Sequence, residues 1–336
     1  GSNDALESPS ASIPNTINAS MTLTADKVWS INGKVNVKAP AVLTIEAGTT
    51  LAGATPNSFM VIEPGAQIIA NGTQAAPIVF TSQKDVDGYS QDNAAGEWGG
   101  LVLAGNAYTH YGVAKYEADE SVEFGSADHT HDADSSGTLK YVVIKHTGYE
   151  VEKDKELNGL SLGGVGSGTT IDHVAVIGSL DDGIEVWGGK VAMSDLYLYN
   201  NADDSLDWDH GWTGSATNIY VEQNEVDGTG SRGFETDNNG GSTTKELAVP
   251  ISNPTIDKFT IITAAAGGQG IVHREGTAGQ ISNGIVITNN TGKANIEIRS
   301  AQTLTNGLAY SGAMVLSQSA GIHYKGAAED LNDDIL

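Results

Sequence analysis

The chain has 336 residues and a formal net charge of −25, because 42 acidic residues outnumber 17 basic ones. This charge excludes nucleic acid as an expected partner, since few basic groups are available to neutralise phosphates. A divalent cation, a neutral glycan or a basic partner fits better. With 42 Gly, 8 Pro and no Cys, the composition favours many short strands joined by tight turns.

Residues 1–20 are poor in large apolar side chains, and we expect them to form a flexible tether. Gly1 and Ser2 are typical of the remnant of a cleaved tag, so a signal peptide and a lipid anchor could have stood upstream. No stretch approaches the roughly 20 apolar residues of a membrane-spanning helix. We therefore expect no transmembrane segment.

Internal repeats begin in the first third of the chain. Residues 43–53 (LTIEAGTTLAG) and 60–72 (MVIEPGAQIIANG) share an apolar-x-Ile-Glu-x-Gly pattern at an offset of 17 residues. That period is too short for a propeller blade, which needs roughly 40 residues. It favours a β-solenoid, in which each coil stacks on the next.

The second half repeats an apolar-x-apolar triplet, at first every 22 to 24 residues. Its members are Leu160-Ser161-Leu162, Ile184-Glu185-Val186, Leu206-Asp207-Trp208, Phe234-Glu235-Thr236, Ile271-Val272-His273 and Ile296-Glu297-Ile298. Because side chains alternate along a strand, the flanking residues are expected to point inward and the middle one toward solvent. The sequence predicts an all-β, single-stranded, right-handed parallel β-helix over residues 21–326, with a capping or tethering segment at 327–336.

A second column of strands is expected beside the first, and polar residues stand at or just before the start of its apolar triplets. They are His173, Asp195, Asn218, Lys258 and Asn283. Asn and Asp tolerate left-handed backbone conformations and bond to nearby backbone groups. Stacked in register, these residues are expected to form a ladder.

The alternation places acidic side chains on one outer face of three successive coils. Glu185, Asp207 and Glu235 are expected nearly above one another, with Asp209 and Asp237 alongside. Carboxylates on neighbouring strands repel each other. Such a column requires a bridging cation such as Ca²⁺, carboxyls that stay protonated with a raised pKa, or basic partners.

Further residues are candidates for the same face. Arg232 and Arg274 are the available basic partners, and Trp208 is expected in the core. The candidate ligand-binding residues are Asp182, Trp187, Asp204, His210, Trp212 and Arg232. Tryptophans at the rim would suit sugar stacking.

A second candidate metal site lies in the segment from residue 128 to residue 134, where Asp and His alternate. Its potential ligands are Asp128, His129, His131 and Asp132. Imidazole and carboxylate are both competent ligands for a transition metal. The alternative is a solvated acidic loop, which the surrounding Gly, Ser and acidic residues also favour.

Several motifs resemble a set of exported bacterial β-helix proteins known mostly as lipoproteins or surface proteins. They are EWGGLVLAGNA (97–107), SGTLKYVVIKHTG (136–148), DDGIEVWGG (181–189), ADDSLDWDHGWTG (202–214) and SRGFETDNN (231–239). This resemblance implies a periplasmic protein, an outer-membrane lipoprotein or a cell-surface protein of a bacterium.

The pattern is also similar, at the level of the superfold, to pectate lyases, polygalacturonases and phage tailspikes. Pectate lyases hold Ca²⁺ with stacked carboxylates and use a nearby arginine as base. The resemblance implies that Glu185, Asp207 and Glu235 could imitate the carboxylates and Arg274 the base. Of the polygalacturonase pattern, only the paired aspartates are present, at 181–182 and 203–204.

Three functions follow from these patterns. The first is a surface module that binds a cation, a glycan or both through Glu185, Asp207, Asp209, Glu235 and Asp237. The second is a polysaccharide hydrolase or Ca²⁺-dependent lyase that uses the same carboxylates, with Arg274 as a further catalytic candidate. The third is a structural spacer or adhesin, in which the acids serve solubility and Ca²⁺-dependent stiffness.

Overall fold

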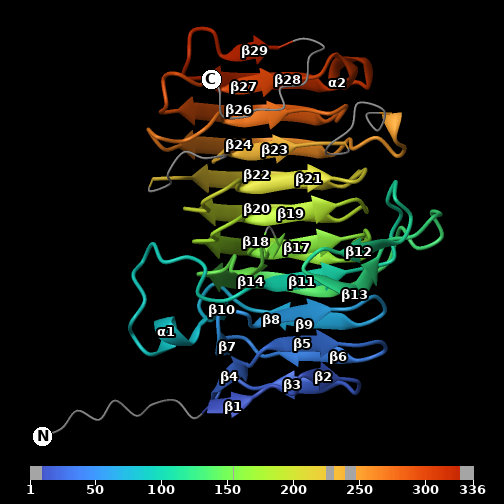
Figure 1. Cartoon of the computed structure of the whole chain (residues 1–336), viewed down its shortest axis with the longest axis vertical. Helices are drawn as coiled ribbons and strands as arrows, with labels where there is room; N and C mark the ends of the chain where they lie inside the picture. The colour runs from blue at the N-terminus through green and yellow to red at the C-terminus, as the bar shows by residue number, and fades with distance from the viewer. Residues whose placement is uncertain (1–9, 154, 225–230, 239–246, 326–336) are drawn as a thin grey trace, which may run out of the picture.

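The structure, a computed structural model, describes residues 10–153, 155–224, 231–238 and 247–325. Its strands wind in successive coils along one axis, with the first coil at one end and the last coil at the other (Figure 1). Every pairing between neighbouring coils within the two main sheets is parallel. The predicted parallel β-helix is confirmed.

The first main sheet, sheet A, joins the longer strands. They are β1 (Ser10–Ser12), β3 (Met21–Leu23), β4 (Val28–Ile31), β6 (Val42–Ile45), β7 (Thr50–Gly53), β9 (Gln67–Asn71), β10 (Ile78–Ser82), β14 (Gly137–Lys145), β18 (Thr170–Ile177), β20 (Ala192–Tyr199), β22 (Ser215–Glu222), β24 (Thr255–Thr263), β26 (Gln280–Thr288) and β28 (Ala309–Leu316).

The second main sheet, sheet B, carries the predicted acidic columns. Its strands are β2 (Thr16–Ile17), β5 (Lys34–Val37), β8 (Phe59–Ile62), β11 (Leu101–Ala104), β17 (Leu160–Gly163), β19 (Ile184–Trp187), β21 (Leu206–Asp209), β23 (Phe234–Thr236), β25 (Ile271–His273), β27 (Ile296–Ile298) and β29 (Ile322–Tyr324). Two antiparallel pairs, β12 (Ala114–Tyr116) with β13 (Asp119–Phe124) and β15 (Glu150–Glu152) with β16 (Lys155–Glu156), and two short helices, α1 (Gln83–Val86) and α2 (Ala301–Thr305), lie outside these sheets.

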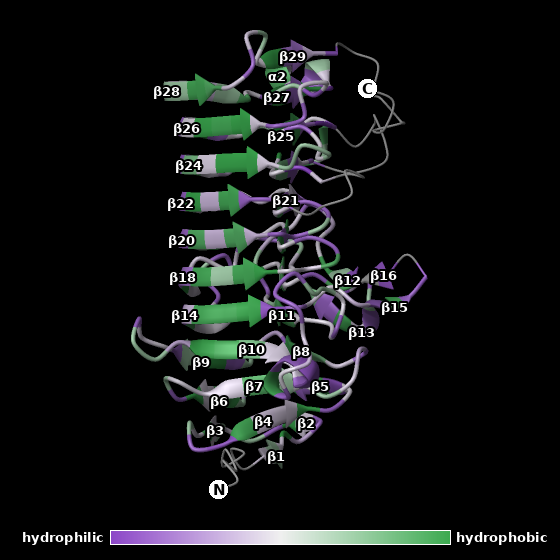
Figure 2. Ribbon diagram, turned by 90° about the vertical axis from the view of Figure 1, so that its left-hand side faces the viewer, coloured by the Kyte–Doolittle hydropathy of each residue, from purple (hydrophilic) through white to green (hydrophobic). Residues whose placement is uncertain are grey.

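Apolar side chains fill the interior because each strand turns alternate residues inward. Leu160, Ile184, Leu206, Phe234 and Ile271 stand in register on five successive coils, and each is fully buried. Green, which marks hydrophobic residues, recurs along the sheet A strands from β14 to β26 in Figure 2, interrupted by paler or purple bands. Each coil buries its inward face against its neighbours.

The predicted polar ladder is confirmed, and the structure shows why it forms. In the early coils β9 and β10 are separate strands, whereas β14 is continuous and pairs with both. Tyr141 stands between the two paired halves with a φ of 49°. Left-handed residues recur at this bend in the following coils: His173, Asp195, Asn218, Lys258 and Asn283, with φ between 52° and 58°.

The first coil begins earlier than expected. β1 pairs with β4 and β2 pairs with β5, and Ile13 and Ile17 are buried. Residues 10–20 therefore belong to the β-helix rather than to the tether predicted over 1–20, because their apolar side chains join the core. Residues 1–9 and the segment predicted as a cap, 327–336, lie outside the described residues.

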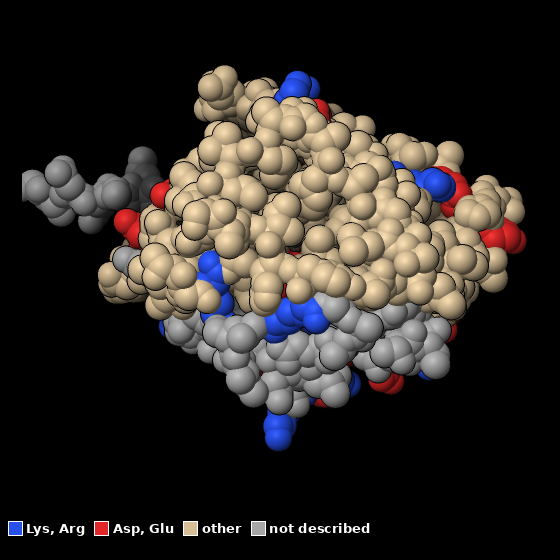
Figure 3. All heavy atoms as spheres, turned by 90° about the horizontal axis from the view of Figure 1, so that it is seen from above, with Lys and Arg blue, Asp and Glu red and all other residues tan. Residues whose placement is uncertain are grey.

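The end of the solenoid that carries the last coil is seen from above in Figure 3, and most of its visible, described surface is uncharged. The described part of the chain has no helix that is both long and apolar enough to cross a membrane.

Candidate functional site

The predicted acidic column exists on sheet B. Glu185 of β19 pairs in register with Asp207 of β21, which pairs with Glu235 of β23. In the neighbouring column Trp187 pairs with Asp209, and Asp237 directly follows β23. Three successive coils therefore bring carboxylates together on one outer face, as the sequence predicted.

The rest of that column is not open to solvent, which corrects the expectation for its outward positions. Ser161, Val272 and Glu297 continue the column and are at most 1% exposed. Glu297 is buried against Arg299, with its Oε2 2.6 Å from Nε. Arg299 is itself fully buried. An outward position on this face is therefore not necessarily a solvated one.

A hairpin explains part of this burial. Tyr116, Val122 and Phe124 of β12 and β13 pack onto Val61 and Val102, which point outward from sheet B, in a second apolar cluster outside the coil interior. An ion pair between Asp119 of the hairpin and Lys34 of β5 also ties it to the sheet. The hairpin thus closes one end of the acidic face.

A ladder of side chain to backbone hydrogen bonds precedes the acidic column, at the turns that lead into the strands. The Asp182 N–H donates to Oδ1 of Asn158 (3.3 Å), the Asp204 N–H to Oδ1 of Asp182 (3.1 Å), and the Arg232 N–H to Oδ1 of Asp204 (3.2 Å). All four residues are buried. The ladder fixes Asp182 and Asp204 one above the other.

Two groups of carboxylates in these turns could hold a metal ion. Oxygens of Asp182, Asp204 and Asp207 lie within 4.8 Å of one another, and so do oxygens of Asp181, Asp182 and Asp203. Asp182 and Asp204 each use one oxygen in the ladder, and their carboxyl groups also lie beside those of Glu185 and Glu235, respectively. Carboxylate oxygens are the ligands that Ca²⁺ prefers, in groups of six to eight with backbone carbonyls and water.

Burial raises the pKa of all three aspartates of the first group well above the usual value. For Asp182 the charge of Asp181 adds to this rise, and for Asp204 that of Asp203. For Asp207 the next causes are Glu185 and Glu235. The described residues include no ion pair between Asp207 and a basic side chain, so its charge lacks the compensation found one coil later.

On that next coil, arginines compensate the charge. Arg232 Nη1 lies 2.7 Å from Glu235 Oε2, Arg274 Nη2 lies 3.1 Å from Oε1, and Arg274 Nε lies 2.6 Å from Asp237. Burial acts to raise the pKa of Glu235, but Arg274 and Arg232 lower it to about 2. The pKa of Asp237 is raised to about 7 by burial, against the effect of Arg274.

Arg274 stays a cation in this setting. Burial acts to lower its pKa, but Asp237 and Glu235 raise it above the usual value. An arginine held in two ion pairs is a poor proton acceptor. This opposes the role of base that the resemblance to pectate lyases assigned to it.

Between the hairpin and the acidic column lies a pocket of about 310 Å³, lined by Lys115, Tyr116, Glu117, Phe124, Glu185, Trp187, Asp209 and His210. Glu185 accepts a hydrogen bond from Asn158 Nδ2 at 2.7 Å. Burial nevertheless raises its pKa to about 8, with Asp209 and Glu117 contributing. The hairpin residues of this pocket escaped the sequence analysis, because nothing in their spacing showed that β12 and β13 fold back over sheet B.

The tryptophans divide between the core and the pocket. Trp208 is fully buried, which confirms the prediction, and so is Trp212, which we had expected at the rim. Trp212 Nε1 donates to the Val191 carbonyl at 3.1 Å, so it is not available for sugar stacking. Trp187 is partly buried and lines the pocket, and His210 lies beside it with Nδ1 3.7 Å from Asp209.

The loop from residue 128 to residue 134 brings together only part of its predicted ligand set. His129 Nδ1 lies 2.6 Å from Asp132 Oδ2, and the other oxygen of Asp132 accepts from the Tyr108 N–H at 3.1 Å. Asp128 accepts from the Thr130 N–H within the loop. None of the four predicted ligands belongs to the two groups of potential metal ligands described above. The transition-metal site in this loop therefore remains a prediction.

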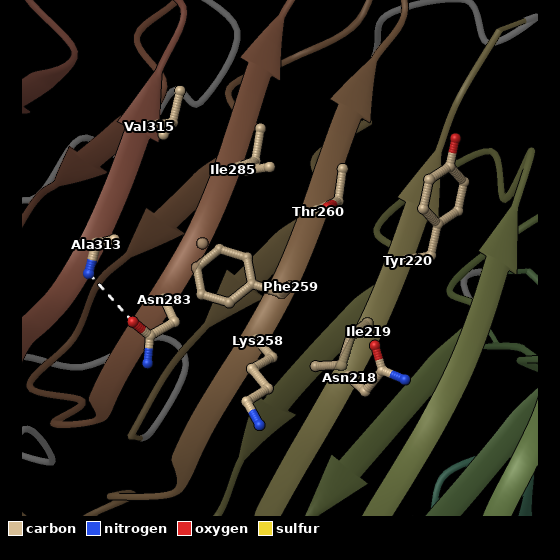
Figure 4. A pocket seen from close by; sticks show the side chains of 11 residues that line it. Asn218, Ile219, Tyr220, Lys258, Phe259, Thr260, Asn283, Ile285, Ala313 and Val315 are labelled. Carbon is tan, nitrogen blue, oxygen red and sulfur yellow. Dashed lines mark hydrogen bonds between the residues drawn. The ribbon is translucent and has the colours of Figure 1, made fainter.

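A separate groove of about 430 Å³ lies on the outer face of sheet A (Figure 4). Asn218, Lys258 and Asn283 of the left-handed ladder line it, together with Tyr220, Phe259, Thr260, Ile285 and Val315, among others. Its described lining residues include no carboxylate. This groove therefore takes no part in the acidic site.

A comparison with known families matches residues 15–325 to the pectate-lyase-like β-helix domain. No curated protein and no solved structure matches the chain.

Proposed function

The chain belongs to the pectate-lyase-like β-helix family, and from this premise we propose that it is an exported bacterial protein that binds Ca²⁺ through Asp182, Asp204 and Asp207. The observation that supports this proposal is the approach of three carboxylate oxygens within 4.8 Å at a largely buried position. Three ionised carboxylates at that spacing would oppose folding, and Arg232 offsets only part of the charge, at Asp204. A divalent cation removes the repulsion.

The coil geometry favours a hard cation over a transition metal at this position. The group consists of carboxylates alone, and imidazole or thiolate ligands would be expected for zinc or copper. Backbone carbonyls at the turns and water can complete the larger shell that Ca²⁺ requires. Asp181 and Asp203, in the adjoining group, add further carboxylate oxygens nearby.

The proposal is tested with Asp204→Asn and a matched control. Asn158 occupies the equivalent ladder position one coil before Asp182, so an asparagine at 204 can keep the acceptor for the Arg232 N–H while removing a charge. Calorimetric titration of wild type with Ca²⁺ should show binding, and Asp204→Asn should abolish or strongly weaken it. The exposed control Asp92→Asn should bind as wild type does.

Thermal unfolding gives a second measure. At a Ca²⁺ concentration about 100 times Kd, the native state should gain about 2.7 kcal/mol. The absence of both binding and stabilisation in wild type would leave the spacer or adhesin function as the better account.

Polysaccharide cleavage is a second candidate, supported by the raised pKa of Glu185 beside Asp209 in one pocket. A carboxyl that keeps its proton near neutral pH can serve as a general acid. Release of reducing ends from a polysaccharide panel, lost in Glu185→Gln and retained in Asp92→Asn, would support this activity. No release from any polysaccharide would oppose it.

A further inference from the structure

The pocket beneath the β12–β13 hairpin has the size and closure of a small-molecule site. Its volume of about 310 Å³ lies at the lower end of the roughly 300–1,000 Å³ typical of such sites. The hairpin forms one wall, and strands β19 and β21 contribute Glu185, Trp187 and Asp209 to the other. It is distinct from the group formed by Asp182, Asp204 and Asp207.

Three aromatic rings from separate segments meet at this pocket. The Trp187 ring lies 5.7 Å from that of Tyr116 at an interplanar angle of 63°, and 6.1 Å from that of Phe124 at 30°. The three rings pack against one another, and all three residues also line the pocket. Aromatic ring faces attract organic ammonium ions, because each face is electronegative.

The charged lining also favours a cation. Glu117 and Asp209 contribute two carboxylates, and Glu185 adds a carboxyl that keeps its proton near neutral pH, against the amine of Lys115 and the imidazole of His210. An anion would meet this excess of acid and be repelled. A ligand that carries a positive charge would instead compensate it.

We propose that this pocket binds a small organic ammonium ion, with the rings of Trp187, Tyr116 and Phe124 beside the positive group and the carboxylates of Glu117 and Asp209 balancing its charge. The inference goes beyond the proposed Ca²⁺ site and does not depend on it. The ammonium group can be quaternary or can be the amine of a sugar, and the chemistry of recognition is common to both.

The experiment titrates the full chain with three probes: choline, glucosamine and glucose. Choline represents a quaternary ammonium ion, glucosamine an amino sugar, and glucose the neutral counterpart of glucosamine. At least one ammonium probe should bind with one-to-one stoichiometry, and glucose should bind at least about tenfold more weakly. Binding of glucose as tight as that of glucosamine, or no binding of either ammonium probe, would overturn the proposal.

Variants locate the binding. Trp187→Leu should lower the affinity for the ammonium probe about tenfold, and Glu117→Gln should lower it about threefold. Glu117 is exposed, so its variant keeps the test valid if Trp187→Leu fails to fold. Glu120→Gln, an exposed change on the same hairpin outside the pocket, should leave the affinity unchanged. Equal affinity in wild type, Trp187→Leu and Glu117→Gln would contradict the assignment.

The two sites are separated by crossed titrations. Glu117→Gln should keep the Ca²⁺ affinity of wild type, and Asp204→Asn should keep the ammonium affinity. If wild type binds an ammonium probe but not Ca²⁺, the proposed function is wrong. If wild type binds Ca²⁺ but no ammonium probe, the pocket proposal is wrong.

Discussion

Asp207 and Glu235 are paired in register on β21 and β23, yet their surroundings shift the pKa values of the two carboxyl groups in opposite directions. Burial and the neighbouring acids Glu185 and Glu235 raise the pKa of Asp207. Burial also acts to raise the pKa of Glu235, but Arg274 and Arg232 lower it to about 2. One coil of the solenoid therefore balances its negative charge within the protein, and the coil before it does not.

The arginine side of this contrast predicts a large loss of stability on Arg232→Met. Removing one partner of a buried ion pair leaves the other charge uncompensated and costs about 3–5 kcal/mol. Arg232 is only 2% exposed and lies 2.7 Å from Glu235. Urea unfolding at pH 7 measures the change, with the exposed Lys84→Met as control. A loss below about 1 kcal/mol would show that the pair matters little.

The acidic side predicts that the Ca²⁺-free protein loses stability as the pH rises. Glu185 has a pKa of about 8 in the folded protein against an ordinary 4.5, so between these values the folded state holds more protons than the unfolded state. The free energy of unfolding must then fall with rising pH across that window.

Glu185→Gln removes the titrating group and tests this slope. In EDTA, the stability difference between pH 5 and pH 8 should be smaller in the variant than in wild type by about 1 kcal/mol or more. Asp92→Asn serves as the control, because Asp92 is exposed. Identical slopes in wild type and Glu185→Gln would contradict the raised pKa.

The column of acidic residues was predictable because a β-helix repeats one rule. Backbone hydrogen bonds hold consecutive coils in register. The inward or outward direction of each residue in a triplet such as Ile184-Glu185-Val186 therefore also holds for the residues paired with it on the neighbouring coils. The Arg232–Glu235 pair was foreseeable only as a candidate. Its geometry depends on side chains from three coils, which spacing alone does not specify.

Two features failed prediction for definite physical reasons. Trp212 follows His210 and Gly211, whose φ values are 62° and 86°, and alternation cannot be extended across such a turn. The hairpin β12–β13 covers the outer face through apolar contacts of Tyr116 and Phe124. An insertion of this kind leaves no periodic signal, so the pocket beneath it was invisible in the sequence.

The burial of Trp212 predicts that it stabilises the fold rather than binding sugars. Trp212→Ala should lower the free energy of unfolding by about 3–5 kcal/mol, because removal of a buried aromatic ring leaves a cavity. Chemical unfolding provides the measurement, and Tyr89→Ala provides a control with an 80% exposed ring. Similar small losses in both variants would place Trp212 at the surface.

The left-handed ladder predicts opposite effects of two substitutions at one position. Lys258 has a φ of 58°, a left-handed conformation that is unfavourable for L-residues and most unfavourable for β-branched ones. Lys258→Val should therefore destabilise the protein by about 1 kcal/mol, whereas Lys258→Asn should retain or raise its stability. Equal unfolding free energies for the two variants would show that the bend tolerates any residue.

The coupling of metal binding to protons tests the central claim most directly. Asp182, Asp204 and Asp207 have raised pKa values in the metal-free protein, and carboxylates must be deprotonated to bind a metal. Titration calorimetry with Ca²⁺ at pH 6, in two buffers of different ionisation enthalpy, counts the protons released. We predict release of about one proton or more per Ca²⁺ bound. Ca²⁺ binding without proton release, or no Ca²⁺ binding at all, would contradict this account of the aspartates.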